Sequence, residues 1–295
     1  MYYRKYFLAL LLAAFTTGSI AQDDAKFEVH ELAQGLYMIQ GVGGFTGGNI
    51  GLSVGEDGVI LIDDSMPPFL DKLQAAIASI TKQPIDFLIN THVHGDHTGN
   101  NEAFGTSGAH IVAHKNLRKR LREDGMAGPD GNKPTPKNAL PVITFDRAIS
   151  FYLNQYTAKV FHVENAHTDG DAVIYFKEAN VIHTGDAFFN GLFPFIDSAN
   201  GGSVSGFIAA QKKILSKANA ETKIIPGHGS LATAADLKAS IAMLEDSLKM
   251  VSKLKKAGKS EDQVVAANPL KKYHDKWNWG FITTEKMTRT LYQAK

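Results

Sequence analysis

The sequence of 295 residues contains no cysteine. Disulfide bonds, thiolate metal ligands, cysteine nucleophiles and lipid attachment through an N-terminal cysteine are therefore excluded. An excess of charge of one sign is also missing, because 31 Lys and Arg residues oppose 30 Asp and Glu residues and leave a formal net charge of +1. No overall electrostatic field attracts the chain to nucleic acid. A hydrophobic content of 44% with 21% charged residues instead predicts an ordinary globular protein.

Long hydrophobic runs are missing too, apart from one near the N-terminus. Arg4 and Lys5 precede the apolar stretch 7–15, which is too short to span a bilayer comfortably. The small-x-small pattern at 19–21 completes the pattern of a secretory signal peptide, predicted at residues 1–21; an uncleaved membrane anchor is the alternative. Cleavage is expected to leave an exported protein, most simply in a bacterial periplasm, with no stable membrane association.

The densest basic stretch, residues 115–122, has five Lys or Arg side chains. Glu123 and Asp124 follow it, and no aromatic side chains are interleaved with its charges. This pattern is typical of a solvated helix face, whereas nucleic-acid surfaces combine basic and aromatic groups. We therefore predict no nucleic-acid partner.

The mature chain alternates between stretches with the two-residue period of strands and stretches with the spacing of helices. Residues 41–48 contain five glycines around Phe45 and are predicted to form a mobile hairpin tip or flap. The strand-then-helix order occurs twice, which predicts two α/β halves that share one core. Strands are expected within 27–40, 49–63, 85–90, 142–163, 172–184 and 223–225, and helices at 71–80, from about 116, at 203–217 and at 233–256.

Histidine and aspartate residues indicate the chemistry. The heptapeptide Thr91-His92-Val93-His94-Gly95-Asp96-His97 places three imidazoles and a carboxylate within six residues, and these groups suit Zn²⁺ or Fe. Four side chains do not complete two metal sites, so further ligands are needed. The candidates are His167, Asp186 and His228, each in a glycine-flanked loop beside a predicted strand. Each of these three alone is more often a loop, turn or core residue, but all occur together with the heptapeptide.

The order His92-x-His94-x-Asp96-His97, His167, Asp186, His228 resembles the signature of the metallo-β-lactamase-fold hydrolases, over roughly residues 27–255. The resemblance implies an α/β four-layer αββα sandwich of two mixed sheets flanked by helices, with a two-metal site at one edge. It also implies the roles of the ligands: His92, His94 and His167 hold the first metal, Asp96, His97 and His228 hold the second, and Asp186 bridges both. Asp63, which ends the run Leu61-Ile62-Asp63, matches a buried strand-end aspartate that orients a histidine ligand; a simple turn residue is the alternative. The expected domains are residues 22–258 and a C-terminal extension, 259–295, packed on them.

The mechanism expected from this resemblance is metal-assisted hydrolysis. Two Zn²⁺ ions per chain, with Fe or Mn as possible replacements, lower the pKa of a shared water, and the resulting hydroxide attacks a carbonyl. Asp96 is expected to orient the hydroxide and accept its proton. The substrate is predicted to be a small molecule, namely an ester, thioester, lactone or amide. The oligomeric state is not predicted.

Two alternatives stay open. The first is a β-lactamase of the same fold. The missing cysteine excludes the β-lactamases with a zinc-bound cysteine. Another antibiotic-hydrolysing group has a serine at the position that corresponds to Asp186. The resemblance therefore favours the thioesterase, lactonase and nuclease-type branches, in which this position is an aspartate. The second is a metal-binding protein without efficient catalysis.

Three residues are candidates for the substrate pocket. Phe45 on its glycine-rich flap is placed to close over an apolar substrate. Phe193 belongs to the aromatic segment 188–195, whose phenylalanines either line the pocket or fill the core. Asn190 in the same segment is a candidate hydrogen-bond donor to a developing oxyanion.

Overall fold

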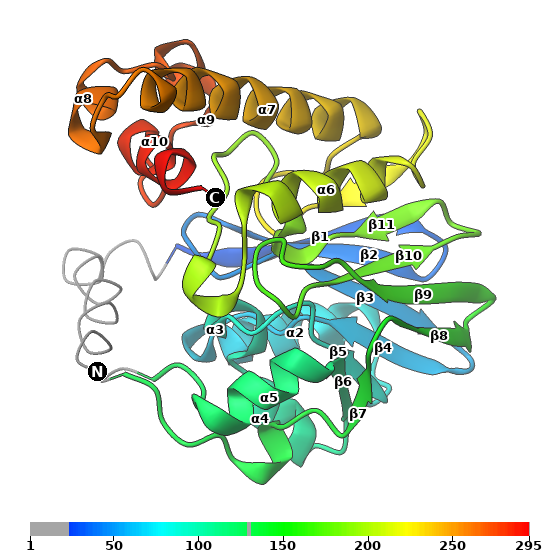
Figure 1. Cartoon of the computed structure of the whole chain (residues 1–295). Helices are drawn as coiled ribbons and strands as arrows, with labels where there is room; N and C mark the ends of the chain where they lie inside the picture. The colour runs from blue at the N-terminus through cyan, green and yellow to red at the C-terminus, as the bar shows by residue number, and fades with distance from the viewer. Residues whose placement is uncertain (1–23, 129–130, 295) are drawn as a thin grey trace. The chain divides into compact units, whose positions relative to one another are not determined.

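The computed structural model describes residues 24–128 and 131–294, so the predicted signal peptide at 1–21 lies outside the described residues. The described chain forms two compact units, the first ending at Thr144 and the second beginning at Phe145. Each unit contains one mixed β-sheet, of seven strands in the first and five in the second, with helices packed against it (Figure 1). The predicted α/β class with two mixed sheets is confirmed.

The sheet of the first unit joins its strands in sequence order. The first four strands are antiparallel, whereas β4, β5 and β6 are parallel. Parallel strands direct their carboxyl ends to the same edge of a sheet, which is the usual place for a ligand site. The strands are β1 (Lys26–Ala33), β2 (Leu36–Val42), β3 (Ile50–Gly55), β4 (Gly58–Ile62), β5 (Phe87–Ile89), β6 (His110–His114) and β7 (Ile143–Phe145).

The side chains of strand β4 are buried on both faces of this sheet. Its sequence is apolar without alternation, as expected of a strand covered on both sides. Leu61 packs with Leu73 and Ile77 of α2 on the helical face, while Ile60 and Ile62 are buried on the opposite face. The helices of this unit are α2 (Leu70–Ile80), α3 (Gly95–Thr98), α4 (Asn101–Thr106) and α5 (Lys115–Glu123), with 3₁₀ turns η1 (Pro67–Phe69) and η2 (Lys137–Ala139).

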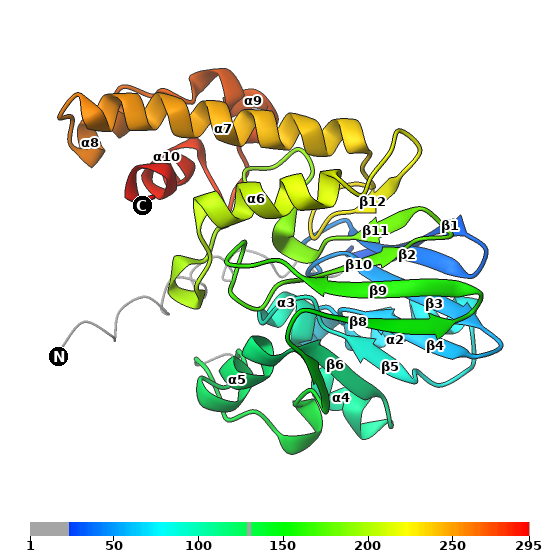
Figure 2. The same cartoon turned by 45° about the vertical axis from the view of Figure 1, so that its right-hand side comes forward.

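The sheet of the second unit has the order β12-β11-β10-β9-β8, as Figure 2 shows. Only the β11–β12 pair among these is parallel, so two carboxyl strand ends lie side by side here as well. The strands are β8 (Ala148–Leu153), β9 (Tyr156–His162), β10 (Ala172–Phe176), β11 (Val181–His183) and β12 (Lys223–Ile225).

Helices α6 (Val204–Leu215) and α7 (Ala234–Lys256) lie side by side (Figures 1 and 2). Ile214 of α6 and Leu237 of α7 pack on the sheet residues Ile182 and Ile224. Thr233 and Asp236 form a reciprocal capping box that fixes the start of α7. Within the described residues no helix, including the 23-residue and lysine-rich α7, is long and apolar enough to cross a membrane.

The residues after Gly258 add helices to the second unit. Trp277, Met287 and Leu291 are buried in the same hydrophobic cluster as Phe207 of α6 and Leu244 of α7. The C-terminal segment therefore shares a core with the helices that cover the second sheet. Its elements are α8 (Glu261–Ala266), η5 (Lys271–Tyr273), α9 (His274–Trp277) and α10 (Thr284–Gln293).

Candidate metal centre

In the first unit, the predicted ligands and the predicted supporting residue Asp63 follow two adjacent parallel strands. Ile62 at the end of β4 lies opposite Ile89 at the end of β5, and the Asp63 amide donates a hydrogen bond to the Ile89 carbonyl oxygen at 2.9 Å. Asp63 directly follows β4, and the histidine heptapeptide begins two residues after β5. The strand register therefore places Asp63 beside the heptapeptide.

The heptapeptide gathers its donors through a tight turn into α3. His92 and His94 precede the helix, whereas Asp96 and His97 are on it. One ligand atom each of His92, Asp96 and His97 lies within 4.8 Å of the others. The His92 ring centroid is 4.2 Å from that of His97 and 5.0 Å from that of His94. This unit alone therefore presents two imidazoles and a carboxylate at metal-binding spacing.

Asp63 orients the imidazole of His97. Its carboxylate Oδ2 accepts a hydrogen bond from His97 Nδ1 at 2.7 Å, so the opposite nitrogen, Nε2, points to Asp96 Oδ2 at 3.6 Å. A carboxylate on the far nitrogen fixes the tautomer and raises the basicity of a histidine ligand. Asp63 has a left-handed φ of 60°, a backbone conformation that aspartate adopts more readily than most residues other than glycine.

Thr91, which we did not predict, extends this support to a second histidine. Its amide and hydroxyl both donate to the Asp63 carboxylate at 2.7 Å. The hydroxyl oxygen is also 3.1 Å from His92 Nδ1, where it accepts that nitrogen's proton. One buried carboxylate therefore holds two predicted ligands, one directly and one through Thr91.

The second unit repeats the arrangement at the ends of β11 and β12. Asp186 follows β11 and His228 follows β12, and the strands are parallel. His167 lies in the turn between β9 and β10. Asp186 Oδ2 is 3.3 Å from His167 Nε2, and its Oδ1 is 3.4 Å from His228 Nε2. One carboxylate thus faces two imidazoles from different loops, a geometry that suits a bridging ligand.

The loop that carries His167 is fixed by hydrogen bonds on both sides. His167 Nδ1 donates to the Phe195 carbonyl oxygen at 2.8 Å, which leaves Nε2 to face Asp186. Asp171 accepts the Thr168 amide proton at 2.8 Å and also the Thr168 hydroxyl. Burial raises the pKa of Asp171 to about 7, although these hydrogen bonds act in the opposite direction. The buried carboxyl thus holds the turn closed next to the ligand.

A second buried carboxyl supports the loop of the first unit. Asp64 Oδ1 accepts the Asn100 amide proton at 2.9 Å, and the Asp64 amide donates to the His97 carbonyl oxygen at 3.1 Å. Burial raises the pKa of Asp64 well above its usual range, and the charge of Asp63 adds to this effect. Asp64 therefore ties the end of β4 to the segment that carries His97.

Two glycines allow close approach to the ligands. A Cβ atom added to Gly48 would lie 2.0 Å from His97 Cε1, and one added to Gly227 would lie 2.0 Å from Asp186 Oδ1. Neither contact is possible between real atoms, so any larger residue would displace the ligand side chain. These two positions require glycine for the space beside the ligands.

Gly227→Ala is therefore expected to lower zinc affinity at least tenfold, because displaced supporting contacts weaken metal sites by about 10–100-fold. Competition with a chromogenic chelator measures the affinity. Gly280→Ala is the matched control, since no heavy atom lies within 4 Å of the added Cβ there. Equal zinc affinities in the two variants would show that Asp186 does not depend on the space at Gly227.

The substrate-pocket candidates differ in their surroundings. Phe45 is 51% exposed in the loop between β2 and β3. Asn190 donates from Nδ2 to the Ser230 carbonyl oxygen at 3.0 Å, and its backbone amide donates to the His228 carbonyl oxygen at 2.9 Å, so it holds the loop around His228. Phe193 is fully buried in a hydrophobic cluster, which fits the alternative that it fills the core.

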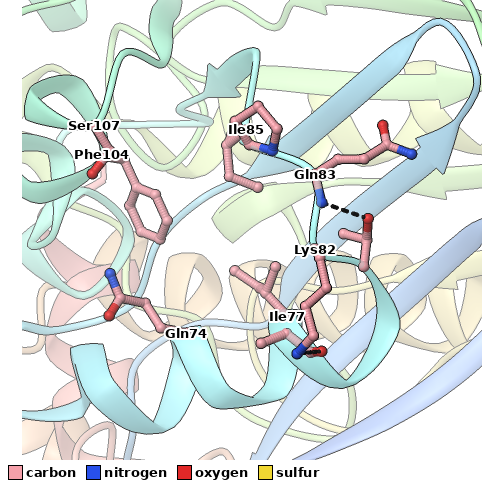
Figure 3. Close-up of a pocket in the computed structure, with 10 residues that line it drawn as sticks. Gln74, Ile77, Lys82, Gln83, Ile85, Phe104 and Ser107 are labelled. Atoms are coloured by element: carbon pink, nitrogen blue, oxygen red, sulfur yellow. Dashed lines mark hydrogen bonds between the residues drawn. The ribbon is translucent and has the colours of Figure 1, made fainter.

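The first unit also has a separate surface pocket of about 260 Å³ (Figure 3). Its lining includes the apolar side chains of Ile77, Ile85 and Phe104 and the polar side chains of Gln74 and Lys82. Its residues 81–85 precede β5, whereas the histidine heptapeptide follows that strand. The pocket is therefore at the opposite ends of the strands, and no predicted ligand lines it.

The donor set fits divalent metal ions. Across the two units the seven predicted ligands are five imidazoles and two carboxylates, which Zn²⁺, Fe and Mn all accept. His97 and His167 each donate from Nδ1 to an oxygen, the usual arrangement of a histidine whose other nitrogen binds a metal.

A family model described as the metallo-beta-lactamase superfamily matches residues 43–234, more than half of the chain. The chain belongs to the metallo-β-lactamase superfamily. Members of this superfamily are hydrolases, and the match includes all seven predicted ligands as well as Asp63.

Solved structures support the same assignment at the level of the fold. A metallo-β-lactamase from Pontibacter korlensis is 18% identical with a TM-score of 0.63, over 75% of this chain and 100% of that one. The DIM-1 metallo-β-lactamase is 14% identical with a TM-score of 0.58, over 75% of this chain and 97% of that one. With the two mixed sheets, these similarities confirm the predicted superfamily fold.

One sequence relative is the hydroxyacylglutathione hydrolase of Pelagibacter ubique (strain HTCC1062). It is 26% identical over 107 residues, which are 36% of this chain and 37% of the relative. The alignment therefore spans little more than a third of that relative's length.

Proposed function

We propose that the chain is a dinuclear zinc hydrolase in which water attacks the carbonyl carbon of a small ester, thioester, lactone or amide and breaks the bond from that carbon to the leaving oxygen, sulfur or nitrogen. The observation that carries the proposal is the pair of ligand sets. Each unit places at least two imidazoles and a carboxylate in segments that follow its strands, and each set includes a histidine whose Nδ1 is already engaged by an oxygen. Neither set alone has enough donors for two ions, since a catalytic zinc takes three protein ligands.

We assign the ligands so that both sets share two ions. His92, His94 and His167 would hold the first, and Asp96, His97 and His228 would hold the second. Asp186 would be a ligand of both, an assignment supported by the similar distances of its two carboxylate oxygens to His167 and His228.

When bound, a pair of divalent ions supplies Lewis acidity: it lowers the pKa of water and polarises a carbonyl oxygen. The residues of the chain supply orientation and proton transfer. Asp63 and Thr91 keep the protons of His97 and His92 on Nδ1, so both imidazoles present a neutral Nε2. Asp96 would orient the attacking water and accept its proton, a role that fits the position of its carboxylate among the ligands, 3.6 Å from His97 Nε2.

The substrate class rests on one expectation and one comparison. The resemblance places the Asp186 carboxylate at the bridging position, which favours the thioesterase and lactonase branches, and the sequence relative is named a hydroxyacylglutathione hydrolase. We therefore place an acyl ester or thioester ahead of a β-lactam.

The test uses Asp96→Asn with three chromogenic probes: an aryl ester, an acyl thioester and a cephalosporin. Zinc-loaded wild type should hydrolyse the ester or thioester, and Asp96→Asn should lose about 10²–10⁴-fold in kcat because a positioned general base contributes that much. Metal content is measured in the same samples. Wild-type turnover of the cephalosporin alone would replace the proposal with a β-lactamase, and no turnover of any probe by metal-loaded protein would favour a binding protein.

A further inference from the structure

An aromatic segment of the C-terminal extension lies next to the ligands of the second unit. Trp277 and Ile282 at the two ends of this segment are buried in the hydrophobic core. Trp279 between them is half-buried, and Phe281 is 39% exposed. The segment is thus anchored at both ends and presents two aromatic rings between the anchors.

These rings continue an aromatic surface that begins at the metal ligands. The Phe189 ring stacks on His228 with centroids 5.1 Å apart, and the Trp279 ring is 6.4 Å from both. The Phe195 ring is 5.7 Å from His167. We call the four residues Phe189, Phe195, Trp279 and Phe281 the aromatic wall.

Phe281 joins the two parts of the wall. Its ring is 5.4 Å from that of Phe195 and 5.6 Å from that of Trp279, in edge-to-face geometry, which is the preferred packing of aromatic pairs. The wall is therefore continuous from His167 through Phe195, Phe281 and Trp279 to His228.

Hydrogen bonds hold the wall in place. The Phe193 amide donates to the Trp277 carbonyl oxygen at 2.7 Å, and Trp279 Nε1 donates to the Phe193 carbonyl oxygen at 2.9 Å. On the other side, Lys286 Nζ lies 5.3 Å from the centre of the Phe281 ring and donates to the Phe281 carbonyl oxygen at 2.8 Å. A preorganised apolar surface loses little conformational entropy when it binds a ligand.

We propose that the aromatic wall binds an apolar acyl or aryl group of the substrate and so places the adjoining carbonyl beside His167 and His228. Core packing explains why Phe189 is buried. It does not explain why Phe281, at the far end of a surface that starts at two predicted ligands, is partly exposed to solvent. Trp279 and Phe281 are outside residues 43–234, which match the family model, so the wall gives this chain a substrate preference that the superfamily match does not supply. The inference rests on the proposed function for the position of the carbonyl.

The experiment measures binding and turnover separately along one series of chain lengths. Acetate, butyrate, hexanoate and octanoate are titrated into the zinc-loaded mature protein by calorimetry, and the p-nitrophenyl esters of the same acids are hydrolysed. Affinity and kcat/KM should rise roughly threefold to fourfold per added methylene until the wall is covered. Trp279→Ala and Phe281→Ala should each lower octanoate affinity about tenfold and leave acetate affinity unchanged.

Tyr152→Ala is the matched control, because Tyr152 is a 77% exposed aromatic residue of the same unit. Phe281→Ala removes an exposed ring, so it tests the wall even if Trp279→Ala does not fold. A flat response to chain length in wild type, or an octanoate affinity in Phe281→Ala equal to that of wild type, would overturn the inference. Binding that depends on chain length, without turnover of any ester, would support the aromatic wall and contradict the proposed function. Turnover with a flat response to chain length would support the proposed function and contradict the aromatic wall.

Discussion

Asp186→Ala is expected to remove at least one of two bound metal ions and to lower kcat/KM by roughly 10³-fold or more. Asp186 is 5% exposed, and its two oxygens face His167 and His228 at 3.3 and 3.4 Å. Without this carboxylate, the two imidazoles lose the group that faces both. A loss of about 4 kcal/mol of transition-state stabilisation corresponds to 10³ in rate, and metal ions supply several kcal/mol.

Metal analysis and initial rates on the same preparation test this expectation. Asp275→Ala is the control, because it removes an exposed carboxylate from the same unit. It should keep wild-type metal content, rate and melting temperature. Full turnover by Asp186→Ala with two bound ions would show that this carboxylate is not a ligand.

Asp63→Ala is expected to lower the free energy of unfolding by about 3–5 kcal/mol, because it leaves buried hydrogen-bond donors of Thr91 and His97 without their acceptor. Asp63 is completely buried, so water does not readily replace the carboxylate. The same change should weaken zinc binding about 10–100-fold, since the orientation of His97 depends on it.

Two further variants separate stability from metal binding in the Asp63 experiment. Asp63→Asn keeps one acceptor oxygen for Thr91, but the NH₂ group that replaces the second oxygen does not accept a hydrogen bond from His97. This variant should therefore lose less stability than Asp63→Ala. Glu56→Ala changes an exposed carboxylate in the turn before β4 and should be neutral in both measurements. Denaturant unfolding and chelator competition provide the two values; wild-type stability and affinity in Asp63→Ala would rule out the orienting role.

The elements that the sequence predicted well have strong local patterns. The helix expected at 233–256 is α7 (Ala234–Lys256), and the one expected at 203–217 is α6 (Val204–Leu215). The short helices α3 and α4 were not predicted, because four and six residues are too few to establish a helical period. Tertiary contacts decide such short elements.

The ligand candidates could be named because histidine and aspartate are informative residue types in a known order. Their supports could not. The sequence shows Thr91 only as the first residue of the heptapeptide. Its supporting role depends on its hydrogen bond to Asp63, which the β4–β5 register makes possible. Gly48 and Gly227 look like ordinary loop glycines until the neighbouring side chains are placed.

The aromatic wall also depends on contacts that the sequence does not predict. Trp279 belongs to the predicted C-terminal extension, and it packs on the hydrophobic core. Its contact with His228 and its hydrogen bond to Phe193 join segments far apart in the sequence. No local pattern indicates such a pairing.

The metal dependence of acyl ester hydrolysis by the wild-type mature protein tests whether the chain is a dinuclear metal hydrolase. Metal content and rate are measured before chelation, after removal of metal with dipicolinate, and during stepwise return of Zn²⁺. We expect two ions per chain, loss of activity in the metal-free protein and recovery that is complete at two equivalents. Unchanged hydrolysis by the metal-free protein would contradict this expectation.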